Sequence, residues 1–403
     1  MKEWKTYRVG DICSSISETY KDHSKEVVLI NTSDVLEGRC LNHEFVPNKD
    51  LKGQFKKVFK FGDILYSEIR PANKRFAYID FDATNYIAST KLMVIRNNDK
   101  VTNRFLYHYL KSESTIAELQ ALAESRSGTF PQITFSELSQ LEISIPDIET
   151  QLAISGFIDT LESKIELNRQ INDNLEQQAQ ALYKSWFVDF EPFKDGEFIE
   201  SEIGEIPAGW SIVKFGDIVE IPKKTINPQK FPDTIFNHYS LPACDNGLIA
   251  EVQAGKDIMS NKIILQSNTT LFSKLNPRIK RIWFTCEVLP NSICSTEFIP
   301  YRAKTDTEYS YIFSIVNSDA FYSSVMGCVN GATGSHQRFH AEDTEDFLCA
   351  YNKDAVNEFS KLIEPVLKQM YDLRQENVKL ALTRDTLLPK LMSGELKIND
   401  LDC

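Results

Sequence analysis

Residues 154–186 read ISGFIDTLESKIELNRQINDNLEQQAQALYKSW, and mainly apolar side chains recur in this stretch at alternating steps of four and three. The seam begins at Ile154, passes through Ile158 and Ile165, and continues to Trp186. Apolar residues at this spacing line one stripe of an α-helix, which can pair with another helix in a coiled coil. The pattern therefore predicts a long helix that needs a partner.

A second stretch, residues 359–391, reads FSKLIEPVLKQMYDLRQENVKLALTRDTLLPKL and repeats the seam after a shift of 205 residues, from 154 to 359. Asn172 and Asn377 occupy equivalent positions in the two seams. A buried asparagine in an apolar seam weakens helix pairing but fixes its register. We therefore expect the two helices to form an antiparallel coiled coil within the chain, rather than two unrelated amphipathic surface helices.

The globular parts of the chain are also duplicated. A shift of 206 residues brings Trp4 onto Trp210 and the tripeptide Gly-Asp-Ile at 10–12 onto the one at 216–218. The same shift, without a gap, finds identical residues for Leu65, Ser67, Pro71, Lys74, Arg75, Ile87, Ser89, Thr90 and Arg96. Clusters of identities in one register indicate an internal repeat.

Each copy is predicted to be a mixed α/β domain followed by a long helix, which makes the fold class α+β with a pseudo-two-fold relation. Strands are expected in the first copy at Val27–Asn31, Lys57–Phe61, Asp63–Ser67, Phe76–Asp80, Lys91–Arg96 and Leu141–Ile145, with a helix at Asn103–Ala123. The expected boundaries are 1–149 for the first domain, 150–186 for the first spacer helix, 187–209 for a connector, 210–349 for the second domain, 350–394 for the second spacer helix and 395–403 for a tail.

The net charge of −12 argues against a nucleic-acid partner until its distribution is considered. The segment from Asp189 to Glu205 holds seven acids and one base, which is half of the total charge. Residues 52–75 hold seven bases and two acids, and residues 256–281 hold six bases and one acid, so each of these two patches carries +5. Each patch in isolation could be a solvated face. Because the repeat carries the patch twice, we expect both to contact DNA.

Candidate DNA-contacting residues come from these patches and from one glycine-containing loop in each copy. In the first copy they are Arg70, Asn73, Lys74, Arg75, Arg126, Thr129 and Gln132. In the second copy they are Asn276, Arg278, Lys280, Arg281, Ser335, His336, Gln337 and Arg338. Arginine and asparagine can read base edges with two hydrogen bonds, while lysine mostly contacts phosphates.

Several other classes of protein lack support in the sequence. No apolar run approaches the ~20 residues of a membrane span, and the N-terminus has no apolar signal-peptide core. The eight cysteines form no CxxC pair, which favours reduced thiols in the cytoplasm. There is no P-loop for ATP hydrolysis, and no Asn/Asp-Pro-Pro-aromatic tetrad of an amino-methyltransferase.

Two strings leave alternatives open. Pro146-Asp147 followed by Glu162-Ser163-Lys164 is similar to a nuclease motif, although solvated helix charges explain the second part better. His336 and His340, with Glu342 and Asp343 nearby, have a spacing seen at metal sites, although a polar loop is the more ordinary interpretation. A self-contained Mg-dependent nuclease and a coiled-coil scaffold without a DNA role are therefore kept as alternatives.

Longer motifs resemble one known family. They are the GDI openings, GDILYSEIRP at 62–71, IPDIETQLAISGFIDTLESKIELN at 145–168, the connector WFVDFEPF…ESEIGEIPAGW at 186–210, and LLPKLMSGEL at 387–396. Over essentially its whole length the chain resembles the specificity (S) subunit of type I restriction–modification systems. The second copy departs from the pattern at Tyr351–Glu358, where the IPDIETQ motif does not recur.

The resemblance implies a non-catalytic cytoplasmic subunit with two target-recognition domains. Each domain would read one half of a bipartite double-stranded DNA target, and the helices would set the gap between the halves and dock adenine-methyltransferase (modification) subunits. Restriction subunits, which translocate and cut DNA, are implied as further partners, and a membrane is not. S-adenosylmethionine, ATP and Mg are expected on the partner subunits, with no cofactor and no metal bound by this chain.

Overall fold

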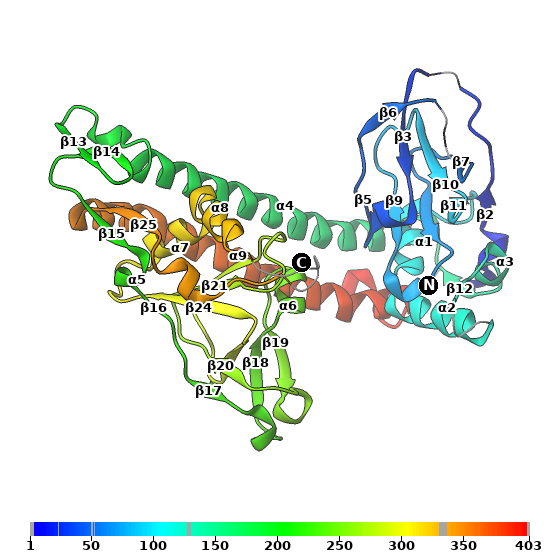
Figure 1. The fold of residues 1–403 in the computed structure, drawn as a ribbon. Coiled ribbons are helices and arrows are strands. Elements are labelled where there is room, and N and C mark those ends of the chain that lie inside the picture. The colour runs from blue at the N-terminus through cyan, green and yellow to red at the C-terminus, as the bar shows by residue number, and fades with distance from the viewer. Residues whose placement is uncertain are drawn as a thin grey trace. The chain divides into compact units, whose positions relative to one another are not determined.

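A computed structural model describes residues 4–22, 24–49, 51, 53–126, 130–329 and 337–400. The chain divides into two compact units. Unit 1 comprises Met1–Ser163 together with Leu380–Cys403, and unit 2 comprises Lys164–Lys379. Each unit therefore contains one globular domain and a segment of each long helix. Figure 1 shows the elements of both units.

The domain of unit 1 is built on two four-stranded sheets. The first sheet has the order β2 (Cys13–Ile16), β11 (Leu92–Asn97), β8 (Ile64–Ser67) and β9 (Phe76–Tyr78), and all its pairs are antiparallel. The second has the order β6 (Phe45–Pro47), β3 (Glu26–Ile30), β10 (Tyr86–Ser89) and β7 (Phe55–Val58), with β3 and β10 parallel. Two further pairs are β1 (Lys5–Arg8) with β12 (Glu142–Ile145) and β4 (Val35–Leu36) with β5 (Arg39–Cys40). The helices are α1 (Asn103–Leu110), α2 (Glu113–Arg126), α3 (Phe135–Leu138) and the start of α4 (Ile148–Phe187).

The domain of unit 2 repeats this topology. Its first sheet has the order β16 (Val219–Glu220), β24 (Phe298–Ala303), β21 (Thr269–Ser273) and β22 (Ile282–Thr285). Its second runs β19 (Glu251–Ala254), β18 (Ile235–Tyr239), β23 (Ser292–Ser295), β20 (Lys262–Ile264) and an added strand β17 (Thr225–Ile226), again with one parallel pair, β18 and β23. Two more pairs are β15 (Ser211–Lys214) with β25 (Leu348–Tyr351) and β13 (Phe198–Ser201) with β14 (Gly204–Pro207). The helices are α5 (Phe215–Ile218), α6 (Leu241–Asp245), α7 (Tyr309–Asn317), α8 (Asp319–Gly327) and most of α9 (Lys353–Ser393). The shift of 206 carries β1 onto β15, β11 onto β24 and β12 onto β25 with the same bounds, so the duplication is confirmed.

The helix predicted at Asn103–Ala123 is two helices, α1 and α2, because the chain turns at Lys111 and Ser112. The hydroxyl of Ser112 accepts a hydrogen bond from the backbone N–H of Thr115 at 3.3 Å, which satisfies a free donor at the start of α2. Apolar periodicity continues across this turn, so the sequence pattern alone did not reveal the break. The corresponding turn in unit 2 separates α7 from α8.

Both long helices complete the core of unit 1. Ile154 and Ile158 of α4 pack with Leu388 and Leu391 of α9 in one buried cluster beneath α1 and α2. The residue after α9 ends, Gly394, has a φ of +75° and lies so close to Trp4 that an added Cβ would be 2.8 Å from its indole ring. The two ends of the chain therefore pack together in this unit.

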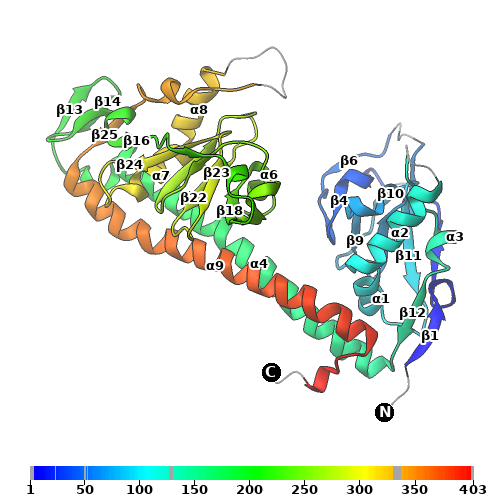
Figure 2. The same cartoon turned by 90° about the horizontal axis from the view of Figure 1, so that it is seen from below.

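The core of unit 2 is strongly aromatic where the helices meet the domain. The ring of Phe187 near the end of α4 lies 4.7 Å from that of Tyr311, 5.1 Å from that of Phe359 on α9 and 5.6 Å from that of Trp210. Because Phe187 contacts Phe359, the end of α4 lies beside the beginning of α9. The helices are therefore antiparallel in this unit, as Figure 2 also shows.

The buried stripe of α4 is wider near its end than the heptad prediction. The expected seam residues Leu182 and Trp186 are half-buried and pack against the core, with the ring of Trp186 6.1 Å from that of Phe359, while Tyr183 and Phe187 are buried as well. An α-helix has 3.6 residues per turn, so its apolar stripe drifts from a 3.5-residue repeat over several heptads.

Among the described helices, none combines the length and apolar character that a bilayer crossing requires.

Candidate nucleic-acid interface

The two basic loops connect equivalent strands and share the backbone of their first turn, but they differ at the lysine: Lys74 has a φ of 52° after a 3₁₀ turn at Pro71–Asn73, whereas Lys280 has no positive φ. We name residues 68–75, between β8 and β9, and residues 274–281, between β21 and β22, the tethered loops. Arg70 has a φ of 44° and Asn276, its counterpart, has a φ of 48°. This left-handed conformation is uncommon for residues other than glycine and asparagine. In both loops the next residue is a proline (Pro71 or Pro277), whose ring fixes its own φ.

Each tethered loop is held against the glycine-containing loop of its own unit. In unit 1 the backbone N–H of Arg70 donates to the carbonyl of Pro131 at 3.1 Å, and Ile69 forms a β-bridge with Gln132. In unit 2 the N–H of Asn276 donates to the carbonyl of Gln337 at 2.9 Å. A bridge between Leu275 and Arg338 completes the match. The two groups of candidate residues, distant in sequence, thus lie together in both units.

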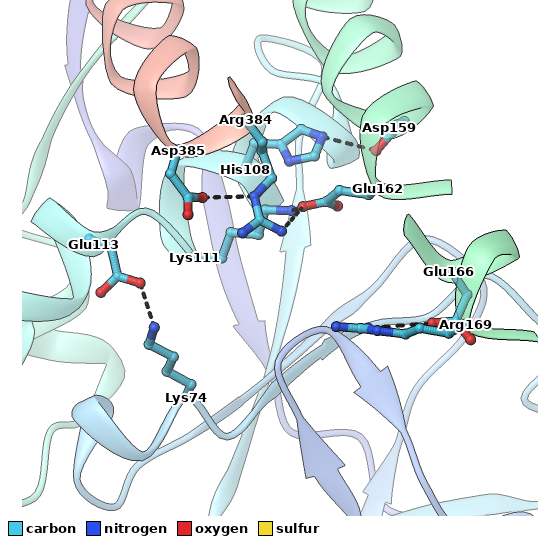
Figure 3. A network of polar contacts seen from close by, with 10 residues as sticks. All are labelled: Lys74, His108, Lys111, Glu113, Asp159, Glu162, Glu166, Arg169, Arg384 and Asp385. Atoms are coloured by element: carbon cyan, nitrogen blue, oxygen red, sulfur yellow. Dashed lines mark hydrogen bonds and ion pairs between the residues drawn. The ribbon is translucent and has the colours of Figure 1, made fainter. Parts of the chain in front are cut away.

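The Lys–Arg pair of the unit 1 loop is bound within the domain. The ammonium of Lys74 lies 2.5 Å from the carboxylate of Glu113, the first residue of α2, as Figure 3 shows. The guanidinium of Arg75 donates to the carbonyl of Ser33 at 3.0 Å and to that of Val35 at 3.4 Å. These contacts attach one end of the loop to the α1–α2 corner and to the segment that follows β3.

The equivalent pair of unit 2 has equivalent attachments. Lys280 donates to the carbonyl of Asn317 at 2.6 Å, at the corner between α7 and α8, and burial lowers the pKa of its ammonium group. Arg281, whose side chain is 15% exposed, binds the carboxylate of Asp245 on α6 with two hydrogen bonds of 2.6 and 2.9 Å. Helix α6 follows β18 as the anchoring segment of unit 1 follows β3. The duplicated cations therefore have a structural role in both units.

Residues in the turn of each tethered loop, before the anchored Lys–Arg pair, are largely exposed. Arg70, Asn73 and Arg278 point to solvent, and no described residue forms an ion pair with either arginine. Ile279, the counterpart of Asn73, is 48% exposed. We name the positions 70, 72 and 73 of unit 1, and 276, 278 and 279 of unit 2, the tip positions.

A polar triad at the base of each tethered loop joins one predicted residue, Gln132 or Arg338, to two residues that were not predicted from the sequence. Its members are Glu68, Lys91 and Gln132 in unit 1, and Lys274, Glu297 and Arg338 in unit 2. Lys91 lies 3.6 Å from Glu68 and donates to Gln132 at 3.3 Å, while Arg338 binds Glu297 with two contacts of 3.2 Å. Applying the shift of 206 to charged residues, and not only to identities, would have shown that Glu68 and Lys91 are replaced by Lys274 and Glu297, a reversal of charge at both positions.

The remaining candidates are placed as follows. Arg126, the last residue of α2, forms an ion pair with Glu137 of α3. The side-chain oxygen of Gln337 is buried and has no hydrogen-bond partner among the described residues. Thr129, Ser335 and His336 lie outside the residues that the structure describes.

The two seam asparagines have different surroundings. The amide of Asn168 donates to Asn377 at 2.9 Å, and the amide of Asn377 donates to the carbonyl of Ile165 at 3.3 Å. Asn172 is 7% exposed, and its side-chain oxygen has no partner among the described residues. Across the helix pair Asn377 therefore contacts Asn168, which lies one helical turn before Asn172, the residue at the equivalent seam position.

The nuclease-like string does not assemble into a catalytic centre. Asp147 accepts a hydrogen bond from the N–H of Thr150 at 3.2 Å at the start of α4. Glu162 is instead bound to Lys111 of α1 and lies 3.6 Å from Arg384 of α9 (Figure 3). Two cations already neutralise the carboxylate that a metal would need.

Among the described residues, one group has metal-ligand proximity. Ligand atoms of His108, Asp159 and Glu162 lie within 4.8 Å of one another in unit 1. Arg104 approaches Asp159 to 3.4 Å, and Lys111 is bound to Glu162, so an added cation would be repelled. We interpret the group as a charged network that fixes α1 to the long helices. At the other proposed metal position, the backbone N–H of His340 donates to Asp343 at 2.7 Å, which caps a short 3₁₀ helix.

Comparison with known proteins gives one consistent result. The family model of the type I restriction modification DNA specificity domain matches residues 1–177. The chain is 32% identical to the type I restriction enzyme HindI specificity subunit of Haemophilus influenzae, over 98% of this chain and 100% of that protein. It is 23% identical to the MjaIX specificity subunit of Methanocaldococcus jannaschii, over 88% of this chain and 82% of that protein.

The fold agrees with this sequence relationship. The S subunit of a type I restriction–modification system from M. genitalium superposes with a TM-score of 0.53 at 16% identity, over 97% of this chain and 96% of that one. The likeness extends through both domains and both long helices. On the strength of the full-length sequence match, the chain belongs to the family of type I restriction–modification specificity subunits.

Proposed function

We propose that this chain is the DNA-recognition subunit of a type I restriction–modification complex, and that each unit reads one half of a bipartite double-stranded target. Family membership supports this role, because specificity subunits are the non-catalytic recognition component of such systems. The observation that carries the proposal further is the duplicated tethered loop. Each unit presents at least one exposed arginine on a loop whose first turn is anchored to the neighbouring loop in the same way.

The chemistry is assigned to partner subunits. We propose that the long helices dock adenine-methyltransferase subunits, which bind S-adenosylmethionine, and that restriction subunits bind ATP and Mg. The same helices are proposed to fix the gap between the half-sites, since α4 and α9 contribute residues to both units. The chain itself is proposed to bind no cofactor and no metal.

The decisive experiment maps methylated adenines after the chain is produced together with its methyltransferase subunits. Replacing residues 211–345 with the matching domain of a relative should change one half of the methylated motif and leave the other half intact. If the exchange altered both halves, or if the purified chain alone methylated or cut DNA, the proposal would be wrong.

The spacer role has its own test in the same assay. Adding one heptad to both long helices should lengthen the spacer by ~10 Å, which corresponds to about three base pairs. Both half-sites should be retained and the gap between them should widen. A gap that stays constant in the lengthened chain would remove the helices as its determinant.

A further inference from the structure

The identical Lys–Arg pairs of the two tethered loops are bound within their domains, whereas the three tip positions are occupied by residues that differ, as do Glu68 and Lys274 at the base of the loops. The identical Lys–Arg pairs, 74–75 and 280–281, contact helix corners and the segments after β3 and β18. The tip positions are occupied by Arg70, Ala72 and Asn73 in unit 1, and by Asn276, Arg278 and Ile279 in unit 2.

We infer that the Lys–Arg pair positions each tethered loop and that the three tip positions carry the base-specific reading of its half-site. The inference rests on the proposed function, since it concerns the residues that read each half. A guanidinium bound bidentately to a carboxylate would have to give up two charge-assisted hydrogen bonds before it could contact DNA. Residues that are the same in both units also cannot distinguish two different half-sites.

The side chains at the tips have the chemistry of base recognition. Arg70 matches the two acceptors of guanine in the major groove, and Asn73 matches the donor and acceptor of adenine. In unit 2, Arg278 can take the guanine role, displaced by two positions along the loop. Ile279, which is 48% exposed, offers the apolar surface that fits the methyl group of thymine. The two units therefore read different base patterns from one scaffold.

The first turn of the two tethered loops has the same backbone, which favours an exchange of the tips. Arg70 and Asn276 have φ values of 44° and 48°, and asparagine is among the residues that tolerate this conformation best. The N–H of each donates to the neighbouring loop in the same way. At the first tip position, each unit thus already accommodates the conformation that the residue of the other unit adopts.

The first experiment transplants the unit 2 tip into unit 1 by the changes Arg70→Asn, Ala72→Arg and Asn73→Ile. The full chain is produced with its methyltransferase subunits, and methylated adenines are mapped in genomic DNA. We expect a new or relaxed unit 1 half-site, an unchanged unit 2 half-site and an unchanged gap. The reciprocal transplant into unit 2 should alter only the other half-site. A motif unchanged in both halves by both transplants would overturn the inference.

Single substitutions set the expected magnitude. Arg70→Ala or Arg278→Ala should weaken binding of the mapped duplex by about 5- to 150-fold and relax selection at one base pair. The matched control is Arg302→Ala. This arginine lies on β24 and pairs with Glu220 and Asp306, away from the loop. Equal weakening on cognate and unrelated duplexes by the tip variants would identify phosphate contacts and refute base reading.

The second experiment tests positioning by Arg281. Arg281→Lys keeps the charge but loses the bidentate geometry, and Arg281→Met loses both. If the residue positions the loop, both variants should bind about fivefold more weakly, the effect of losing about one hydrogen bond, with an unchanged dependence on salt. If it contacts phosphate instead, lysine should restore binding and methionine should lower the salt slope by about one unit. The second pattern would overturn the positioning role.

The wild-type complex separates this inference from the proposed function. If it methylates no bipartite motif, the proposed function fails, whatever the tip variants do. If it does methylate such a motif, and the tip transplants leave that motif unchanged, only the inference about the tips fails. Circular dichroism of each variant checks that the loop changes leave the fold intact.

Discussion

Replacing Glu162 with glutamine tests the charged network of unit 1 (Figure 3). Glu162 is bound to Lys111, whose side chain is only 10% exposed, so the variant leaves an ammonium group nearly buried beside a neutral amide. Removing one partner of a fully buried ion pair lowers the free energy of unfolding by about 3–5 kcal/mol. An exposed ion pair contributes at most ~1 kcal/mol. Because the side chain of Glu162 is itself 26% exposed, we expect a loss of about 2 kcal/mol.

Hydrogen exchange of the amides in α1, measured by mass spectrometry on the full chain, detects this loss locally. A loss of about 2 kcal/mol should accelerate exchange there by about 30-fold. The control is Glu358→Gln, because Glu358 forms an exposed helix pair with Lys361 and should leave α1 unchanged. Adding Lys111→Met to the Glu162 variant should recover part of the stability, since no unpaired charge remains. Unchanged exchange in the first variant, or no recovery in the second, would refute the reasoning.

Three further predictions concern stability. Asn172→Leu should stabilise the helix pair by about 1 kcal/mol because it removes a buried oxygen that has no partner among the described residues. Asn377→Leu should destabilise the pair because it breaks the hydrogen bond to Asn168. Urea unfolding that shows a change of the same sign for both variants would contradict this prediction. Gly394→Ala should lower the free energy of unfolding of unit 1 by at least ~1 kcal/mol, because the φ of this residue is +75° and the new Cβ would meet Trp4. Indole fluorescence during unfolding reports the change, and an unaltered unfolding midpoint would count against the contact. Burial lowers the pKa of His108, so this residue takes up a proton near pH 6.5 in the unfolded chain but not in the folded one. The stability of α1 should therefore fall as the pH drops below about 6.5, and the dependence of stability on pH should be flatter in His108→Gln. The same dependence in both proteins would exclude this residue as the cause.

The helix pair and the duplication followed from the sequence because both leave regular signals. The apolar stripe from Ile154 onward repeats every turn, and identities such as Trp4 with Trp210 hold one register. Each of the six strands expected in the first copy overlaps an observed strand, but β10 (Tyr86–Ser89) was not predicted because it is buried along its whole length and lacks the alternation that marks a half-exposed strand. The pattern also failed at Ser112, where a single hydroxyl ends the continuity between two helices.

The candidate interface was only partly predictable because the role of a cation depends on partners far away in the sequence. Arg75 and Arg278 look alike in a basic patch. However, Arg75 donates to carbonyls some forty residues earlier, at Ser33 and Val35, whereas Arg278 has no ion-pair partner among the described residues. Composition reports charge, but only tertiary structure separates a bound guanidinium from an exposed one.

The packing of α9 against the first domain has a consequence for synthesis of the chain. Leu388 and Leu391 complete the core that Ile154 and Ile158 begin, and Gly394 packs against Trp4. The domain of unit 1 therefore cannot complete its core until residues 388–394 have been translated, and its apolar surface is uncovered during that interval. A chain that ends before Leu388 would therefore lose core contacts in unit 1, which is made first, and not in the domain of unit 2, which is made later.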